Sequence, residues 1–274
     1  MAGRGWDIVA GVHGPPIVAV QIVNYRTRSY LERCLATVVA DVAADGLAYE
    51  INLLENASGE TLDDLPGRFP TCRVFSSPTN LGFGGGHNLL AARTAAPHLL
   101  ILNPDVELLA PSSIARLLGV LASDRAVKVV GPRLVGADGS PQPYDHGRLH
   151  GLRAQLALRG GHSYWRATDA RQEVAWVSGA ALLIEHPAFD LVGGFDQGLF
   201  LYKEDEDLCL RVRRAGGRVL YEPGVTVRHH GSVVGERRQG LELASAYFFQ
   251  KHGLNRRTHR LARAAHRGLA YLRR

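Results

Sequence analysis

The sequence predicts an α/β fold: a mostly parallel central sheet flanked by helices, with C-terminal helices. Short apolar runs that suit buried strands alternate with stretches that carry one apolar face at helical spacing. Several of the short runs end in polar residues, and ligands bind at the carboxyl ends of strands in open α/β sheets. The predicted strands lie at residues 17–23, 49–54, 73–75, 99–102, 127–130, 174–184, 219–221 and 225–229.

Composition indicates an ordinary globular protein. Of the 274 residues, 46% are hydrophobic and 21% are charged, and the apolar runs are shorter than the ~18 residues that a membrane span needs. The first 14 residues lack the basic start and apolar core of a signal peptide. The three scattered cysteines (Cys34, Cys72 and Cys209) fit neither a disulfide framework nor a CxxC metal site. We therefore expect a cytoplasmic protein.

The basic charge is confined to the C-terminal tail. Residues 251–274 hold eight Lys and Arg and no Asp or Glu, whereas the rest of the chain holds 24 basic and 26 acidic residues. The body therefore gives no reason to expect a nucleic-acid partner. Two helices are predicted here, at 241–252 and 255–272. The second could make a peripheral contact with the inner face of a membrane, or be a solvated terminal helix.

The first part of the chain reads as a β-α-β unit. The strand at 17–23 is followed by Asn24-Tyr25-Arg26 and then by a helix, in which Ser29 and Glu32 have the spacing of a capping box. The strand at 49–54 ends in Glu55-Asn56-Ala57-Ser58. Polar groups therefore follow two neighbouring predicted strands at the edge where ligands are expected.

A glycine-rich stretch runs from Asn80 to Asn88 and contains Gly82 and Gly86. Glycines let backbone N–H groups approach a phosphate, and the helix predicted at 88–95 could direct its N-terminus at that phosphate. A surface loop is the alternative. The stretch differs from the dinucleotide fingerprint GxGxxG because His87 stands at the third glycine.

Asp105 follows the buried strand at 99–102 in the sequence Asn103-Pro104-Asp105. Mg²⁺ is commonly held by one or two carboxylates together with substrate phosphates, so Asp105 is a candidate ligand for such an ion. The alternative is a turn that does no more than end the strand.

The second half of the chain holds an acidic cluster and a pair of histidines. Four carboxylates at 204–207 open a predicted helix, which the helix dipole alone would favour, although one or two of them could face a cleft. His229 alternates with valines on a predicted strand, and His229-His230 could complete a metal shell or be structural. Residues 140–173 read as an irregular loop that could cover the site.

Taken in order, the motifs resemble the family 2 glycosyltransferases, and among them the bacterial rhamnosyltransferase-like branch. The resemblance covers about residues 17–235 and implies a GT-A fold over that range, with an N-terminal extension at 1–16 and a basic helical tail at 236–274. The motifs are Asn24-Tyr25, Glu55-Asn56-Ala57-Ser58, Asn80-x-Gly82-Phe83-Gly84-x-x-x-Asn88, Leu102-Asn103-Pro104-Asp105-Val106, Trp176-x-x-Gly179-Ala180, Gly193-Gly194-Phe195-Asp196, Glu204-Asp205-x-Asp207-Leu208 and Val227-x-His229.

The resemblance also implies roles for single residues. Asp105 and His229 would bind Mg²⁺ or Mn²⁺, with His230 as the alternative to His229, and Asp205 would be the catalytic base. The family usually has Asp where this chain has Glu55. The implied nucleotide-sugar-binding residues are Asn24, Arg26, Glu55, Asn56, Asn80, Gly82, Gly86, Asn88, Asn103 and Asp105; Trp176, Gly179 and Glu204 would line the acceptor or sugar pocket.

The implied function is inverting, metal-dependent transfer from a nucleotide-diphosphate sugar to a hydroxyl of a cell-envelope glycan or lipid-linked saccharide. The branch resemblance favours dTDP-rhamnose as the donor, with a UDP-sugar as the alternative. Two other interpretations stay open: a natural-product glycosyltransferase acting on a soluble small-molecule aglycone, and a non-catalytic sugar-nucleotide-binding scaffold. A nicotinamide-dependent oxidoreductase is disfavoured by the broken GxGxxG and its late position.

Overall fold

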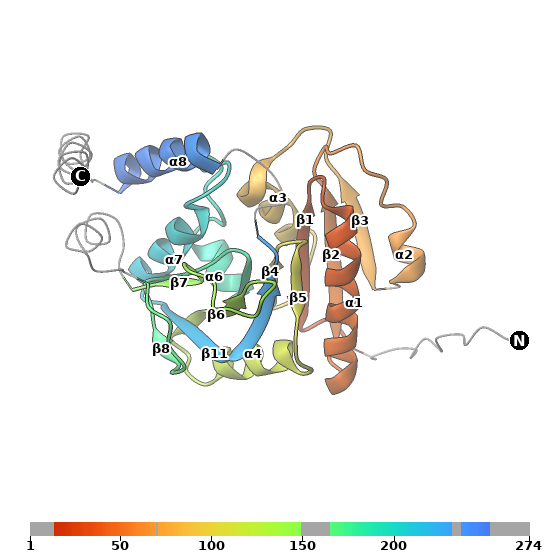
Figure 1. Cartoon of the computed structure of the whole chain (residues 1–274), viewed down its shortest axis with the longest axis horizontal. Coiled ribbons are helices and arrows are strands. Elements are labelled where there is room, and N and C mark those ends of the chain that lie inside the picture. The colour runs from red at the N-terminus through yellow and green to blue at the C-terminus, as the bar shows by residue number, and fades with distance from the viewer. Residues whose placement is uncertain (1–13, 70, 149–164, 232–236, 253–274) are drawn as a thin grey trace, which may run out of the picture.

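A nine-stranded sheet forms the centre of the protein (Figure 1). The computed structural model describes residues 14–69, 71–148, 165–231 and 237–252. The sheet contains β3 (Cys72–Ser76), β2 (Tyr49–Glu55), β1 (Val18–Asn24), β4 (His98–Leu102), β10 (Ala181–Glu185), β6 (Val127–Val135), β11 (Arg218–His229) and β5 (Val106–Leu108) in that order, and β8 (Gln172–Glu173) pairs with β11. A separate two-stranded sheet pairs β7 (His146–Gly147) with β9 (Trp176–Val177).

Most strands run in one direction, as expected from the sequence. The strands β1 to β4 are mutually parallel where they pair. The strand β10 is antiparallel to both β4 and β6, and β11 is parallel to β6, so β6 and β11 share the direction of β1. The carboxyl ends of β1, β2 and β4 therefore meet at one edge, where Asn24 is in register with Glu55.

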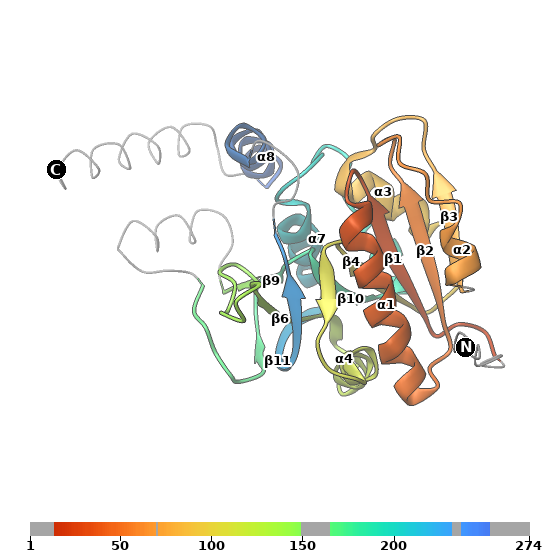
Figure 2. The ribbon, with the colours of Figure 1, turned by 45° about the vertical axis from the view of Figure 1, so that its right-hand side comes forward.

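Helices cover both faces of the sheet (Figure 2). The helices of the described residues are α1 (Arg28–Asp45), α2 (Leu65–Arg68), α3 (Gly82–Ala91), α4 (Ser113–Ala122), α6 (His186–Leu191), α7 (Glu204–Arg214) and α8 (Arg237–Lys251), of which α8 lies beyond α7. Successive strand residues point to opposite faces. Leu100 and Leu102 of β4 accordingly share one core with α1 and α4, whereas Leu99 and Ile101 share the other with residues of α3, α6 and α7.

The start of α1 differs from the sequence expectation. The helix begins at Arg28, and the carboxylate of Glu60 accepts hydrogen bonds from the backbone N–H groups of Thr27 (3.1 Å) and Arg28 (3.3 Å). The predicted Ser29–Glu32 capping box is therefore wrong, and Glu32 forms an ion pair with Arg68 at 3.0 Å. The carboxylate of Glu60, which is distant in the sequence, accepts hydrogen bonds from N–H groups at the start of the helix, the role that the capping-box spacing predicted for Ser29.

The glycine-rich stretch also differs. It is part of α3, which begins at Gly82 and not at the predicted Asn88. A Cβ atom on Gly84 would lie 2.7 Å from the Cβ of Phe195, and one on Gly86 would lie 2.8 Å from a methyl of Val23. These two glycines let α3 pack closely against its neighbours, so the stretch belongs to a packed helix and not to the surface loop that was the alternative.

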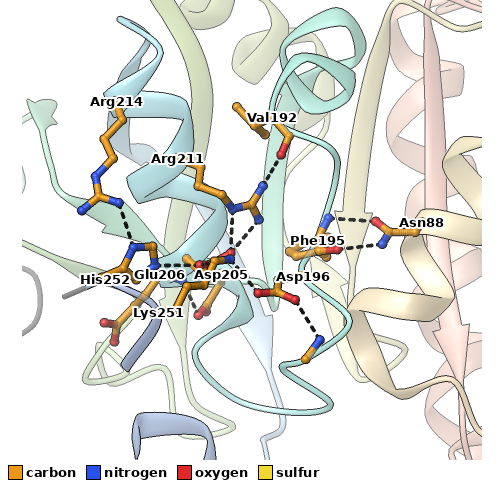
Figure 3. A network of polar contacts seen from close by, with 12 residues as sticks. Asn88, Val192, Phe195, Asp196, Asp205, Glu206, Arg211, Arg214, Lys251 and His252 are labelled. Atoms are coloured by element: carbon orange, nitrogen blue, oxygen red, sulfur yellow. Dashed lines mark hydrogen bonds and ion pairs between the residues drawn. The ribbon is translucent and has the colours of Figure 1, made fainter. Parts of the chain in front are cut away.

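The helix α8 is attached to α7 by a cluster of charged side chains (Figure 3). The fully buried carboxylate of Asp207 contacts Arg211 (2.7 Å), Lys251 (2.7 Å) and His252 (2.8 Å). Lys251 also contacts Asp196, at 2.6 Å. The last acid of the Glu-Asp-x-Asp motif therefore holds the C-terminal end of α8.

Some expectations fall on parts of the chain that the structure does not describe. The tail helix at 255–272, most of the N-terminal extension and residues 149–164 of the irregular loop lie outside the described residues. Within the described part, none of the helices has the length and apolar character needed to cross a membrane.

We expect Asp207→Asn to lower the free energy of unfolding by about 3 kcal/mol, because Arg211 and Lys251 would lose their buried counter-charge. Urea denaturation at neutral pH measures this difference. Asp190→Asn is the matched control, since its side chain is 69% exposed, and we expect a change within about 0.5 kcal/mol. A loss below about 1 kcal/mol for Asp207→Asn would show that this cluster does not stabilise the fold.

Candidate active site

The pairing of β5 with β11 brings Asp105 close to His229. Asp105 lies in the turn between β4 and β5, and the next residue, Val106, pairs with His229. The Nε2 atom of His229 lies 3.5 Å from Oδ1 of Asp105. The other carboxylate oxygen of Asp105 accepts a hydrogen bond from the backbone N–H of Gly231 at 2.9 Å. The carboxylate is buried and held in one orientation.

Gln142 orients the imidazole of His229. Its Oε1 atom lies 2.7 Å from Nδ1 of His229, and its Nε2 atom donates to the backbone carbonyl of the same residue at 3.2 Å. Because an amide oxygen can only accept, Nδ1 carries a proton, and Nε2 is the ring nitrogen that faces Asp105. The amide nitrogen of Asn103 lies 3.2 Å from that Nε2 atom. Gln142 stands in the irregular stretch at 140–173, and no motif in the sequence points to it.

The two side chains suit a divalent cation. A carboxylate oxygen and a neutral imidazole nitrogen are both ligands for Mn²⁺, and oxygen ligands suit Mg²⁺. Among the described residues there is no group of three or more His, Cys, Asp or Glu side chains that could hold an ion. An ion at this place would therefore take its remaining ligands from substrate phosphates and water.

His230 lies differently from its neighbour. Its Nε2 atom is 2.8 Å from Glu107, which also contacts Arg228 at 2.9 Å. The backbone N–H of His230 donates to the carbonyl of Asp105 at 3.1 Å. Of the two histidines, His229 is the one whose side chain faces the Asp105 carboxylate.

Asp205 lies in the first turn of α7, where two backbone groups hold its carboxylate. The N–H of Gly179 donates to one oxygen at 2.9 Å and the N–H of Glu206 donates to the other at 2.7 Å. Burial raises the pKa of Asp205, and these two donors oppose the rise. The carboxyl is thus fixed in direction and more basic than an exposed aspartate.

Glu204 is more strongly perturbed. It is 6% exposed, and its Oε2 atom is buried without a hydrogen-bond partner. Burial, followed by repulsion from the neighbouring Asp205, raises its pKa well above the ordinary value. Glu204 and Asp205 therefore share a motif but have different environments.

The loop at 178–180 connects the two parts of the site. The backbone N–H of Asn103 donates to the carbonyl of Ala180 at 2.8 Å, while Gly179 donates to Asp205. Asn103 also contacts His229 through its side chain. The Asp105–His229 pair and the Asp205 carboxylate therefore lie at the same edge of the sheet and share one hydrogen-bonded frame.

Predicted nucleotide-side residues line the carboxyl ends of β1, β2 and β3. Asn24 contacts Glu60 at 2.8 Å, and the Glu55 carboxylate accepts from the backbone of Ser58 at 2.6 Å. Asn56 bonds to Asn80 at 3.0 Å and to the carbonyl of Gly82 at 3.3 Å. Arg26, also from this set, is exposed and has a positive φ of 59°. Glu60 belongs to this group as well, but sequence reasoning missed it because no motif contains it.

Three other predicted site residues are engaged in packing or in structural hydrogen bonds. The side chain of Asn88 bonds to both the N–H and the carbonyl of Phe195 at 2.8 Å. Gly86 lies against Val23, and the buried Trp176 lies so close to Gly147 that a Cβ there would meet the indole at 2.1 Å. The side chain of Asn88 thus holds Phe195, and Gly86 allows close packing on Val23.

Comparison with known proteins gives the family. The family model described as "Glycosyltransferase like family 2" matches residues 15–245. The chain belongs to this family. It is 29% identical over 238 residues to the N-acetylglucosaminyl-diphospho-decaprenol L-rhamnosyltransferase of Mycobacterium tuberculosis H37Rv, which covers 78% of this chain and 75% of the relative. A 57-residue stretch, 21% of this chain and 22% of the relative, is 46% identical to the rhamnosyltransferase WbbL of Escherichia coli K12.

Solved structures show the same fold at low sequence identity. GalNAc-T7 with UDP, GalNAc and Mn²⁺ has a TM-score of 0.60 and 19% identity over 78% of this chain and 44% of that chain. The mannosyltransferase PcManGT from Pyrobaculum calidifontis with GDP-Man and Mn²⁺ has a TM-score of 0.55 and 16% identity over 86% and 62%. The chain spans less than two thirds of either. The GT-A fold expected from the sequence is confirmed, and this family 2 member is a nucleotide-sugar-dependent glycosyltransferase of the rhamnosyltransferase-like kind.

The environment of Glu204 gives this glycosyltransferase a pH-dependent stability. Because the folded-state pKa is raised, the folded protein holds the Glu204 proton more tightly than the unfolded chain does. The resulting stabilisation is complete below the unfolded pKa of about 4.3 and is lost as the pH rises through the folded pKa. Glu204→Gln has no such proton to lose, so its unfolding free energy should rise relative to wild type as the pH increases above about 4.

Urea unfolding across this pH range measures the difference. Asp63→Asn, at an exposed position between β2 and α2, is the control and should leave the pH dependence of stability unchanged. Parallel curves for Glu204→Gln and wild type would show that Glu204 ionises normally in the folded protein.

Proposed function

We propose that this family 2 glycosyltransferase transfers a sugar from a nucleoside diphosphate to an acceptor hydroxyl with inversion at the anomeric carbon, in a metal-dependent reaction. The observation that carries the proposal is the shared frame: His229 Nε2 lies 3.5 Å from Asp105, and Asn103 connects this pair to the loop that holds Asp205. A diphosphate at Asp105 and a hydroxyl at Asp205 would then approach the same sugar carbon.

Asp105 and His229 would hold Mg²⁺ or Mn²⁺, and the ion would neutralise charge on the leaving diphosphate. Gln142 would fix the ring orientation and the tautomer of His229, with the proton on Nδ1 and Nε2 directed at the ion, because its Oε1 accepts the Nδ1 proton. Two solved relatives of the fold contain Mn²⁺ together with a nucleotide or a nucleotide sugar, which supports this assignment.

Asp205 would act as the general base. Its carboxylate accepts the proton of the acceptor hydroxyl, the hydroxyl oxygen bonds to the anomeric carbon, and the bond from that carbon to the diphosphate oxygen breaks with its electron pair. Attack from the face opposite the diphosphate inverts the configuration. The raised pKa of Asp205 suits the role because it makes the carboxylate a stronger base.

We propose dTDP-rhamnose as the donor and a hydroxyl of a lipid-linked saccharide or cell-envelope glycan as the acceptor. The support is the likeness to the two rhamnosyltransferases, one of which is named for an N-acetylglucosaminyl-diphospho-decaprenol acceptor. Glu55 would accept a hydrogen bond from the N3–H of thymine, since a carboxylate has about four acceptor sites and meets three donors, the N–H of Ala57 and the N–H and hydroxyl of Ser58. Uracil offers the same N–H, so a UDP-sugar is the alternative donor.

Calorimetric titration with dTDP, UDP and GDP tests the donor and the metal together. We expect dTDP to bind most tightly when Mg²⁺ or Mn²⁺ is present and to bind weakly with chelator. Preference for UDP would replace the proposed donor and leave the mechanism standing. No binding of any of the three nucleotides would favour a non-catalytic scaffold.

Variants in the same titration locate the ion. Asp105→Ala should abolish the effect of the metal on dTDP binding, and Gln142→Leu should weaken metal affinity by about 10- to 100-fold because it releases the His229 ring. His230→Ala is the matched control, since its side chain faces Glu107. Metal-dependent binding that persists in Asp105→Ala would exclude Asp105 as a ligand.

Asp205→Asn separates catalysis from donor binding. We expect turnover to fall by ~10² or more, because the amide cannot accept the acceptor proton, while dTDP affinity stays within about twofold. Transfer from dTDP-rhamnose to a synthetic prenyl-diphosphate N-acetylglucosamine measures the rate. Near-normal turnover in Asp205→Asn would remove Asp205 from the role of base.

A further inference from the structure

A second buried carboxylate, outside the site described so far, gathers four hydrogen-bond donors. Asp145 is 2% exposed. One of its oxygens lies 2.7 Å from Nδ1 of His146 and 2.7 Å from Nε1 of Trp165. The other accepts from the hydroxyl of Tyr221 at 2.9 Å and from the backbone N–H of Leu134 at 3.3 Å. Its partners come from β6, β7, β11 and the residue at 165, so one side chain ties four separate parts of the chain together.

The partners of Asp145 are themselves fixed. The ring of His146 stacks on Tyr221 with a centroid separation of 3.9 Å, and both residues are almost fully buried. Buried polar networks in which each group is satisfied are rigid, because any displacement leaves a donor or acceptor unpaired in a low-dielectric interior. The backbone at Asp145 therefore has little freedom to move.

That backbone holds the chain segment just before the active-site loop. The carbonyl of Asp145 accepts from the N–H of Ser178 at 2.9 Å, and the carbonyl of Gly147 accepts from the N–H of Ala175 at 2.7 Å. Between these two bonds, β7 pairs with β9 through His146 and Val177. Ser178 is thus held by Asp145 at the point where β9 ends.

The next residue after Ser178 is Gly179, whose N–H donates to Asp205 at 2.9 Å. There is little room for this loop to shift, since a Cβ on Gly179 would lie 3.1 Å from the ring of Phe83. A continuous path of contacts therefore runs from the side chain of Asp145 through its own carbonyl and Ser178 to the carboxylate of Asp205.

We infer that Asp145 is a positioning residue that sets the direction and basicity of Asp205 through the Ser178-Gly179 backbone. The inference rests on the proposed role of Asp205 as the base. It assigns a role to a residue that belongs to none of the sequence motifs.

The surroundings of Asp205 define what the test must separate. Its charged neighbours are Lys203, Glu204 and Glu206, all from the start of its own helix, together with the buried thiol of Cys209. Among the described residues, the loop at 178–180 contacts Asp205 through the Gly179 N–H, and Phe83 lies against the same glycine; neither carries a charge. A change at Asp145 would thus reach Asp205 through the position of the Gly179 N–H group.

Asp145→Asn is the direct test. The side-chain NH₂ group of the introduced asparagine would stand where one carboxylate oxygen now accepts two hydrogen bonds, either from Leu134 and Tyr221 or from His146 and Trp165. Because NH₂ is a donor, the two donors of that pair would lose their acceptor. The Asp145 backbone should shift, and the Gly179 N–H should move away from Asp205. Because this N–H stabilises the ionised carboxylate, its loss should raise the pKa of Asp205 by on the order of one pH unit.

Carbon-13 NMR titration of protein labelled at the aspartate carboxyl carbons measures this pKa without an acceptor or a donor. The Asp205 signal is identified as the one that disappears in Asp205→Asn. Asp41→Asn is the matched control: Asp41 is also buried and accepts two backbone hydrogen bonds, from Ser113 (2.7 Å) and Ile114 (3.0 Å) at the start of α4. It should lower stability and leave the pKa of Asp205 unchanged.

Tyr221→Phe provides a milder variant in case Asp145→Asn does not fold. It removes one donor from Asp145, and we expect a smaller shift of the Asp205 pKa in the same direction. An unchanged Asp205 pKa in a folded Asp145→Asn or Tyr221→Phe protein overturns the inference. A shift of equal size in Asp41→Asn overturns it too, because the effect would then follow from general loosening.

Turnover measured across pH separates this inference from the proposed function. A base must be ionised, so the acid side of the rate profile should move to higher pH in Asp145→Asn together with the NMR pKa. If the NMR pKa moves and the rate profile does not, Asp145 positions Asp205 but Asp205 is not the base. If Asp205→Asn abolishes turnover and the Asp205 pKa is insensitive to Asp145, the proposed function stands and the inference fails.

Discussion

The candidate site depends on the antiparallel register between β5 and β11. In this register His229 pairs with Val106, the residue directly after Asp105. Successive residues of a strand point to opposite faces, so a shift of one residue would turn the imidazole of His229 away from the carboxylate. The register is held by buried side chains on both strands, including Val106 and Val227, and by the hydrogen bond from Gly231 to Asp105. Apolar packing on the sheet therefore determines where a polar pair can form.

The four adjacent carboxylates at the start of α7 lie in different environments because each has different hydrogen-bond and ion-pair partners. Asp205 receives two backbone donors, and Asp207 receives three cationic or potentially cationic side chains. Glu206 pairs with Lys203, while Glu204 is buried with an oxygen that has no partner. Burial raises the pKa of Glu204, Asp205 and Glu206, and local donors or the Lys203 cation oppose the rise to different extents. Helix-dipole stabilisation alone, which the sequence could suggest for all four, does not distinguish them.

Features that depend on residues close in sequence could be predicted, and features that depend on contacts between distant residues could not. The strands, most helices and the place of Asp105 after a buried strand were predictable, because each depends on residues close in sequence. Gln142 and Glu60 were not, since Gln142 meets His229 across 87 positions and Glu60 meets Thr27 across 33. The role of the glycines of α3 could not be predicted for the same reason. Glycine is needed at 84 and 86 because Phe195 and Val23 lie against these positions, and only folding brings those residues near. The family resemblance recovered the fold, whereas the orienting contacts required the structure.

Asn103 connects the Asp105–His229 pair with the loop that holds Asp205. Its backbone N–H binds Ala180, beside the glycine that holds Asp205, and its side chain meets His229. It follows directly after β4, whose residues Leu99 to Leu102 are almost fully buried, so the frame rests on one of the least movable parts of the molecule. Holding two reactants in an attack geometry can supply about 7–11 kcal/mol of a barrier in favourable cases, and a misplacement of about 1 Å can cost on the order of 10²-fold in rate. A transferase that joins two separate substrates therefore gains from a single rigid residue between their sites. A side chain at 103 that lacked the amide would lose the contact with His229 and keep the backbone hydrogen bond to Ala180.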